Sequence, residues 1–339
     1  MTEVIKKEKF IHLVDTTLRD GSHAISHSYT EVQIKEIASK LDDAGVEYIE
    51  VAHGDGLGAS SINYGFSYLN DNKMLKAAVS VIKKGKLTTL LLPGIGTQKD
   101  IEQAAECGCK VIRIATHVTE ADIAEQHIVM AKKIGLEVSG FLMMIASVKP
   151  KKLAEQAKLF ESYGADFITI ADSSGSLLPD GVKKRVEAVF KTVNIPINFH
   201  AHNNLSLAIG NDIAAVEAGV EYLDCTCRGL GAGAGNAQME VIIGVLDKMG
   251  YKTGVDFYKI MDVAENIVEP LMRRPQVINN TSLMLGYSEV YSSFLLFTYK
   301  AADKFGLDPK DILVELGRRK MVGGQEDMII DVAYEMSKK

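Results

Sequence analysis

Tryptophan is absent from this sequence, and no apolar run is long enough to cross a membrane. The longest apolar stretches, such as LTTLLLPGIG, fall well short of the roughly 20 residues that a membrane helix needs. The opening stretch MTEVIKKEKF carries charges with no apolar segment behind them, so we expect no signal peptide. These absences argue against a membrane protein and against a secreted one.

Cysteine is scarce, and its four residues form two Cys-x-Cys pairs, Cys107/Cys109 and Cys225/Cys227. Zinc ribbons separate their ligands by two residues, so these pairs do not favour a zinc site. Free cysteine is commonly buried, and we expect reduced, buried thiols in a cytoplasmic protein.

Basic residues are too few and too dispersed for a nucleic-acid groove. The sequence has 38 Lys and Arg against 44 Asp and Glu, which gives a formal net charge of −6. A phosphate backbone attracts clustered positive charge, so nucleic acid is not an expected partner.

The sequence does contain a regular alternation of short β-rich runs and helix-like segments. Segments such as TEVQIKEIASKLDDAG and PKKLAEQAKLFESYG have the 3.6-residue period of amphipathic helices. Several of them end in glycine, which tolerates the positive φ of a helix C-cap. The strand-like runs are 11–17, 47–53, 87–93, 110–116, 136–144, 166–172, 195–202 and 221–227.

Strands and helices in this order predict the α/β class and, within it, a (β/α)8 TIM barrel. The alternative is a doubly wound open sheet, which typically has fewer strands; no dinucleotide-binding glycine fingerprint follows the first strand. After Gly250 the strand-like runs stop and helical patterns such as SSFLLFTYKAADKF take over. We therefore expect a barrel domain over residues 1–254 and a helical region over residues 255–339.

Polar side chains collect where the expected strands end. In a barrel these ends meet at one mouth, which is where catalytic residues lie. His53, after the second strand, is expected to have a structural role. The other groups are Arg19, Asp20 and His23 after the first strand, Asp172 and Ser173 at the sixth, and His200 and His202 at the seventh.

Three of these residues form a candidate metal site. His200 and His202 are two apart on one strand, so both imidazoles point to the same face. Together with Asp20 they offer two imidazoles and one carboxylate, and they leave positions open for water or substrate. This donor set suits a divalent ion such as Mn, Mg, Fe or Co.

The motifs LRDGSH, FHAHNNLSLAIGN and GLGAGAGN resemble the superfamily of metal-dependent pyruvate aldolases and acyl-CoA lyases and synthases. Further stretches, among them EVAHGDGLGASSINYGF, GYSEVYSSF and DILVELGRRKMVGGQEDMI, are similar to the 4-hydroxy-2-oxovalerate aldolases, and the resemblance covers almost the whole chain. The wider superfamily usually has Gln where this sequence has His23, and the aldolase branch has His. The stretch DSSGS departs slightly from the expected Asp-Ser-Gly-Gly and keeps Ser173.

This resemblance implies a class II aldolase that cleaves 4-hydroxy-2-oxovalerate to pyruvate and acetaldehyde in the meta-cleavage pathway of aromatic catabolism. It implies a divalent metal on Asp20, His200 and His202, with Mn²⁺ first and Mg²⁺ or Co²⁺ next. One alternative is an acyl-CoA lyase or synthase, against which His23 argues. Another is a metal-binding protein without catalysis, against which the intact polar set argues. A Schiff-base aldolase would need a strand-end lysine, which DFITIAD lacks.

The aldol reaction assigns a role to each polar residue. Arg19, with the metal, stabilises the enolate of pyruvate. His23 is the candidate base for the 4-hydroxyl group, because imidazole titrates in the useful range. Ser173 is expected to bind the substrate carboxylate, and His200 is counted among the substrate-binding residues.

Several residues at the edge of the site complete the expectation. Tyr287 and Tyr291 lie four apart on an expected helix, where core packing would explain either. The resemblance singles out Tyr291 as a catalytic and substrate-binding residue near the aldehyde portion. Leu91 is expected to be a pocket wall and Asn236 an additional or outer metal contact. The glycine-rich stretch 228–237 is expected to be a tight turn beside the metal rather than a phosphate site.

The helical region beyond Val255 holds more amphipathic sequence than a barrel core requires, and such apolar faces usually pack against a partner. The resemblance implies that this partner is an acylating acetaldehyde dehydrogenase, in a heterotetramer or a similar complex. Tyr291 would then link the helical region to the mouth of the barrel.

Overall fold

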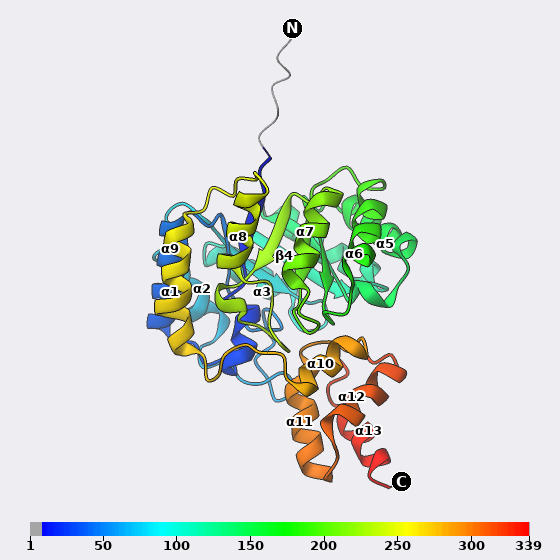
Figure 1. The fold of residues 1–339 in the computed structure, drawn as a ribbon. Coiled ribbons are helices and arrows are strands. Elements are labelled where there is room, and N and C mark those ends of the chain that lie inside the picture. The colour runs from blue at the N-terminus through cyan, green and yellow to red at the C-terminus, as the bar shows by residue number, and fades with distance from the viewer. Residues whose placement is uncertain (1–8, 339) are drawn as a thin grey trace.

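The computed structural model describes residues 9–338, and its centre is a closed barrel of eight parallel strands in chain order (Figure 1). Each strand pairs with the next, and the last pairs with the first. The predicted barrel is confirmed, with every strand within a few residues of its expected run. The strands are β1 His12–Asp15, β2 Tyr48–Glu50, β3 Lys86–Leu91, β4 Val111–His117, β5 Glu137–Met143, β6 Phe167–Asp172, β7 Ile197–Ala201 and β8 Tyr222–Cys225.

Helices surround the barrel, and their ends follow local sequence rules. Thr30 and Gln33 form a capping box at the start of α1, and Gly45, at φ 92°, ends it. Pro150 and Pro179 each occupy the first position of a helix, where the missing N–H has no cost. The helices are α1 Glu31–Ala44, α2 Asp71–Val79, α3 Gln98–Glu106, α4 Glu125–Lys133, α5 Pro150–Ser162, α6 Pro179–Phe190, α7 Ala208–Ala218 and α8 Met239–Lys248.

The interior of the barrel is filled in layers, because alternate side chains of every strand point inward. The layer farthest from the mouth is aromatic and aliphatic and contains Val14, Tyr48, Val111 and Phe167, with Tyr222 beside them. The next layer is charged and polar and contains Glu50, Arg113, Thr169, Asn198 and Asp224. The layer at the mouth contains Leu90, Ala115, Phe141 and Ala171.

The C-terminal helices divide between two hydrophobic clusters. Helix α9 (Phe257–Asp262) and the π-helical turn Val263–Val268 that follows it pack against α1, and their buried side chains join the barrel's core. Helices α10 to α13 form a separate core of their own. The division at residues 254 and 255 stays a prediction. The bounds of these four helices are Asn280–Tyr287, Phe294–Phe305, Pro309–Arg318 and Met328–Met336.

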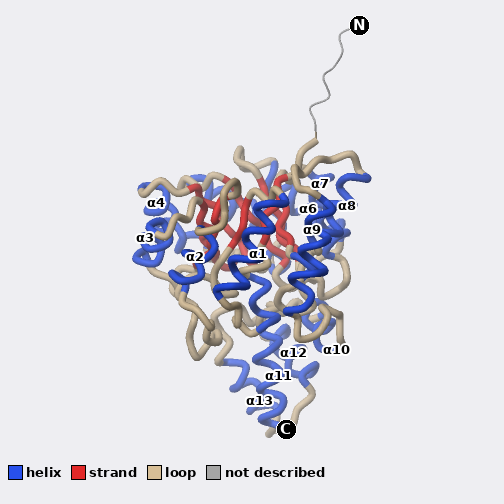
Figure 2. Tube along the Cα trace, turned by 90° about the vertical axis from the view of Figure 1, so that its left-hand side faces the viewer, coloured by secondary structure: helices blue, strands red, loops and turns tan. Residues whose placement is uncertain are grey.

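Helices α10 to α13 lie at the end of the barrel opposite the start of β1, which is the end where the strands point their carboxyl termini (Figures 1 and 2). Two hydrogen bonds from Ser292 to the carbonyl oxygen of Ser173 attach this unit to the end of β6. Within residues 9–338, no helix combines the length and apolarity needed to span a bilayer. All four cysteines are buried and free, as expected.

Candidate active site

The turn that follows β1 places a cation and a carboxylate in the mouth of the barrel. Arg19 is buried, its Nε donates to Glu50 Oε2 at 2.7 Å, and its Nη1 donates to Asp20 Oδ1 at 3.0 Å. The remaining nitrogen, Nη2, is buried without a hydrogen-bond partner. Two acids therefore fix the plane of the guanidinium group, and one edge remains as a free donor.

The three predicted metal ligands converge as expected. One ligand atom from each of Asp20, His200 and His202 lies within 4.8 Å of the other two. The two Nε2 atoms of His200 and His202 are 3.3 Å apart. His200 Nδ1 donates to Asp224 at 2.8 Å, so its Nε2 faces the site with a lone pair. Burial lowers the pKa of His202 to about 3, which keeps that imidazole neutral.

The surroundings of Asp20 also fit a cation. Burial opposes its ionisation, yet the Arg19 guanidinium and the two imidazoles hold the pKa of Asp20 below its usual range. Asn236 donates from Nδ2 to Asp20, while Asn236 Oδ1 is buried without a partner. Asn236 thus contacts a proposed metal ligand, and its role as an additional or outer metal contact stays a prediction. A carboxylate, two imidazoles and an unpartnered amide oxygen form a donor set that fits a divalent metal.

The glycine-rich stretch 228–237 is a tight turn, as predicted, and it packs against Asp20 of the candidate metal site. A Cβ atom on Gly231 would lie 2.8 Å from an Asp20 carboxylate oxygen, so only glycine allows this approach. Asn236 follows three residues after Gly233, which has a φ of 65°. The turn therefore brings Asn236 onto Asp20.

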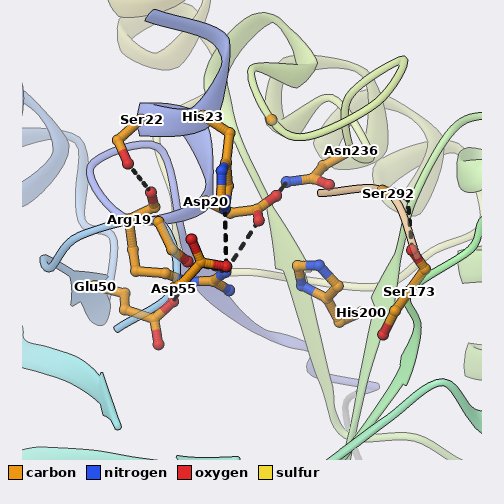
Figure 3. A network of polar contacts seen from close by, with 12 residues as sticks. Arg19, Asp20, Ser22, His23, Glu50, Asp55, Ser173, His200, Asn236 and Ser292 are labelled. Atoms are coloured by element: carbon orange, nitrogen blue, oxygen red, sulfur yellow. Dashed lines mark hydrogen bonds and ion pairs between the residues drawn. The ribbon is translucent and has the colours of Figure 1, made fainter. Parts of the chain in front are cut away.

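His23 lies across the site from His200, on the side of Arg19 and Asp55 (Figure 3). Its Nε2 is 3.8 Å from Asp55 Oδ1. A Cβ atom on Gly54 would come within 2.5 Å of the same nitrogen, so the glycine makes room for the imidazole. Asp55 follows β2, at one of the strand ends where polar residues collect in the sequence, but the sequence alone predicts no role for it.

His27 and His53 lie beside His23, and the rings of His27 and His53 stack with their centroids 3.7 Å apart. His53 accepts from Asp55 N at 3.0 Å and donates to Gly65 O at 3.1 Å, so it has the structural role expected for it. His27, His23 and Asp55 also lie close enough to share a cation. His27 Nδ1 contacts Ser22 Oγ at 3.0 Å, and the sequence predicts no metal-binding role for this second group.

Ser173 and Tyr291 line the same cavity. Ser173 Oγ accepts from Met144 N at 3.0 Å, which leaves its hydroxyl hydrogen free. The Tyr291 hydroxyl is 3.8 Å from Met143 Sδ, and burial raises the tyrosine's pKa. The prediction that Tyr287 and Tyr291 lie on one helix is wrong, because α10 ends at Tyr287 and Tyr291 lies between α10 and α11. Tyr287 is 75% exposed.

Leu91 does not line the cavity, and this correction has a simple geometric cause. Successive side chains of a strand point to opposite faces. Leu90 and Leu92 point inward and line the cavity with Phe141 and Met143. Leu91 points outward and packs in the core between the barrel and its helices.

Buried charged side chains form a connected row beneath the site, and the sequence did not predict this row. Arg113 is fully buried and donates to Glu50 Oε1 at 3.2 Å and to Asp224 Oδ2 at 2.5 Å. Glu50 holds Arg19, and Asp224 holds His200. The signal in the sequence was a charged residue inside each of three otherwise apolar strands, in YIEV, VIRIAT and YLDC.

Comparison with known proteins identifies the family of this chain. The HMGL-like family model matches residues 10–267, and the DmpG-like communication domain matches residues 276–338. The chain is 69% identical to the 4-hydroxy-2-oxovalerate aldolase of Moorella thermoacetica, over 97% of both chains. The chain belongs to the 4-hydroxy-2-oxovalerate aldolase family. The aldolase of the same name from Carboxydothermus hydrogenoformans is 61% identical over 97% of this chain and 98% of its own.

Solved structures share the fold of this aldolase family member at lower identity. The carboxyl transferase domain of Rhizobium etli pyruvate carboxylase, solved with 3-hydroxypyruvate, superposes with a TM-score of 0.84 at 18% identity. That match covers 98% of this chain and 61% of the carboxylase chain. The N-terminal domain of a putative aldolase from Bacteroides vulgatus has a TM-score of 0.72 at 24% identity, covering 84% of this chain and 95% of its own.

Proposed function

We propose that this protein is a divalent-metal-dependent aldolase that cleaves 4-hydroxy-2-oxovalerate to pyruvate and acetaldehyde, a step of the meta-cleavage catabolism of aromatic compounds. One observation carries the proposal. In a chain of this family, the metal-ligand set of Asp20, His200 and His202 meets Arg19 and His23 in one buried site at the mouth of the barrel.

Asp20, His200 and His202 are the proposed ligands of the cation, which we take to be Mn²⁺, with Mg²⁺ or Co²⁺ as alternatives. When bound, the cation supplies positive charge that stabilises the enolate of pyruvate. Arg19 contributes from the other side through its unpartnered Nη2, which can donate to the 2-oxo oxygen as negative charge develops there. Ser173 has a free hydroxyl hydrogen for the substrate carboxylate.

His23 removes the proton from the 4-hydroxyl group in this proposal. As that oxygen forms the carbonyl of acetaldehyde, the C3–C4 bond breaks and its electron pair forms the enolate of pyruvate. The enolate then takes a proton at C3 from the imidazolium of His23, which restores the base. Asp55, at 3.8 Å, is placed to stabilise that imidazolium. Tyr291 is the proposed neighbour of the aldehyde portion.

We further propose that the region from residue 255 onward binds an acylating acetaldehyde dehydrogenase, in a heterotetramer or a similar complex, and that released aldehyde passes past Tyr291. The match of residues 276–338 to a communication domain supports a partner. Large apolar side chains exposed on α10 to α13 support one as well; they include Leu283, Leu296, Val314, Met328 and Tyr334. A cytoplasmic location stays a prediction, with the four free cysteines in its favour.

A coupled assay tests the aldolase. Pyruvate released from 4-hydroxy-2-oxovalerate is followed with lactate dehydrogenase and NADH, after chelation and after adding back Mn²⁺, Mg²⁺ or Co²⁺. We expect activity only with metal and without coenzyme A. Asp20→Asn should weaken Mn²⁺ binding beyond the roughly 10- to 100-fold typical of outer-shell changes. Asp180→Asn, at an exposed position on α6, is the matched control. Activity that survives chelation would refute the metal site.

Co-purification tests the partner. The chain is co-expressed with an acylating acetaldehyde dehydrogenase and run on a size-exclusion column at micromolar concentration. Co-elution, lost on replacing Tyr334 and Met328 together by Asp, would support the interface. Separate elution of the two native proteins would refute it.

A further inference from the structure

Three cavities lie in a row across the mouth of the barrel. The middle one is the reaction chamber, with Arg19, Asp20, His200 and His202. A second cavity shares Leu92, Met143 and Tyr291 with the chamber. A third, of about 280 Å³, shares Ser293 with the chamber, and His23 forms part of its wall. His23, the proposed base, therefore lies between the third cavity and the reaction chamber.

The third cavity is cationic. Arg273 and Arg274 line it, and the other described residues of its wall include no Asp or Glu. This contrasts with the whole chain, whose formal net charge is −6. The nearest acid on the same segment is Glu269, in an adjoining cavity, and Arg228 pairs with it at 2.8 Å. Arg273 and Arg274 line both cavities, and of the two only the third has no carboxylate among its described lining residues.

The segment that carries the two arginines is held in place over the metal site. Gln276 Nε2 donates to Gly231 O at 2.8 Å, and Gly231 is in the turn beside Asp20. Arg273 Nη1 donates to Ser26 Oγ at 3.3 Å, next to the turn that carries His23. Figure 1 shows this segment passing along the end of the barrel between α9 and α10. Arg273 and Arg274 are both exposed residues.

The second cavity, on the Tyr291 side, has the opposite character. Among the described residues of its wall there is one acid, Glu120, and no Lys or Arg. Pro93, Ile95, Ile123 and Met144 make much of the remainder apolar. A carboxylate would be repelled there, whereas a neutral molecule would not be.

The proposed reaction involves both kinds of molecule. Its substrate and pyruvate are carboxylates, and acetaldehyde is neutral. We propose that the cavity lined by Arg273 and Arg274, the arginine vestibule, is an anion-binding site through which 2-oxo carboxylates reach and leave the reaction chamber. The proposal rests on the aldolase function and adds a separate, charge-selective route for the acids. A positive cleft with low-dielectric walls raises the local concentration of anions.

The reverse reaction offers a sharp test, because its two substrates differ in charge. Aldol addition of pyruvate to acetaldehyde is measured for the Mn²⁺-loaded native chain and for R273Q, R274Q and the double variant. In the double variant at low salt we expect the KM for pyruvate to rise about 3- to 10-fold. The KM for acetaldehyde and kcat should stay within about twofold, since neither depends on the vestibule's charge.

Salt and a matched variant serve as controls. At about 0.5 M NaCl the difference between native and double variant should nearly vanish, because screening shortens the reach of charge to a few Å. The double variant K83Q/K84Q removes two exposed cations at the opposite end of the barrel and should behave like the native chain. Equal changes in the KM values for pyruvate and acetaldehyde, or no change in either, would refute the proposed role of the arginine vestibule.

Calorimetric titration of pyruvate into the Mn²⁺-loaded proteins separates the vestibule from the aldolase proposal. Weaker binding to R273Q/R274Q than to K83Q/K84Q supports the vestibule even if turnover is absent. Equal binding refutes it. A native chain with no turnover in either direction would refute the aldolase function alone.

Discussion

His200 donates its Nδ1 hydrogen to Asp224 at 2.8 Å, and this contact joins the proposed metal site to the charged interior of the barrel. Arg113 lies on the other side of Asp224 and also holds Glu50, which in turn holds Arg19. All of these side chains are buried, so their charges interact without much screening by water. One continuous network thus sets the orientation of both the Arg19 guanidinium and the His200 imidazole.

Replacing Asp224 by Asn should therefore weaken metal binding without unfolding the protein. Asn keeps the shape and can still accept from His200, but it removes the charge that makes the imidazole a better ligand. We expect the Kd for Mn²⁺ to rise about 10- to 100-fold, measured by titration calorimetry. Asp212→Asn is the control, because Asp212 is also a buried carboxylate and has no hydrogen bond to the site. Unchanged affinity in Asp224→Asn would show that the contact does not tune the metal.

Replacing His23 by Asn should separate proton transfer from binding. His23 is outside the set of proposed metal ligands, and its Nε2 faces Asp55. We expect the rate of cleavage to fall about 10²- to 10⁴-fold, the usual contribution of a general base. Mn²⁺ content and the affinity for oxalate, a pyruvate analogue, should stay within twofold. His127→Asn, on α4, is the control. A loss of metal in step with the loss of rate would make His23 a ligand instead.

The sequence was sufficient to predict the barrel and the convergence of Asp20, His200 and His202, because both follow from the alternation of strands and helices. Strands and helices alternate with clear glycine boundaries, and two histidines two apart on one strand necessarily share a face. The position of Asp20 after the first strand then followed from the barrel itself, which gathers all strand ends at one mouth.

Local periodicity could not predict which leucines of β3 point into the barrel. It could not predict the charged interior either. Leu90, Leu91 and Leu92 are consecutive, and a parallel strand buried on both faces gives no alternation from which to choose the inward side. Glu50, Arg113 and Asp224 come from three strands far apart in the sequence. Their mutual pairing depends on the register of the closed barrel, which no local pattern contains.

Successive side chains of β3 point to opposite faces, so replacing Leu90 and replacing Leu91 should have different effects. Leu90→Ala enlarges the reaction chamber beside Phe141, so cleavage of a 4-hydroxy-2-oxo acid with one more methylene should gain about 10-fold in relative kcat/KM. Leu91→Ala removes a fully buried side chain from the outer core and should cost about 2–5 kcal/mol of stability. Its substrate preference should match the native chain's. Kinetics on the two substrates and urea unfolding distinguish the variants, and a changed preference in Leu91→Ala would contradict the facing described here.

The last prediction concerns Asp15, a carboxylate that is fully buried at the end of β1. Burial raises its pKa to about 7, although hydrogen bonds from Thr17 lower it; the nearby charges of Glu50 and Asp224 raise it further. Between about pH 4 and pH 7 the unfolded chain has released this proton and the folded chain still holds it. Unfolding is then favoured as pH rises through this window, and the effect levels off above about pH 7.

Asp15→Asn removes this titration while keeping an acceptor for the Thr17 N–H group, which now contacts Asp15 Oδ1 at 3.0 Å. The variant should gain stability relative to the native chain as pH rises from 5 to 8, by an amount between about 1 and 4 kcal/mol. Urea unfolding at both pH values, with chelator present so that metal binding does not contribute, measures the difference. Asp43→Asn, at an exposed position on α1, should show no such gain. Parallel pH profiles for Asp15→Asn and the native chain would mean that Asp15 is already ionised in the folded protein, and its burial would then have to be offset by contacts other than those with Thr17.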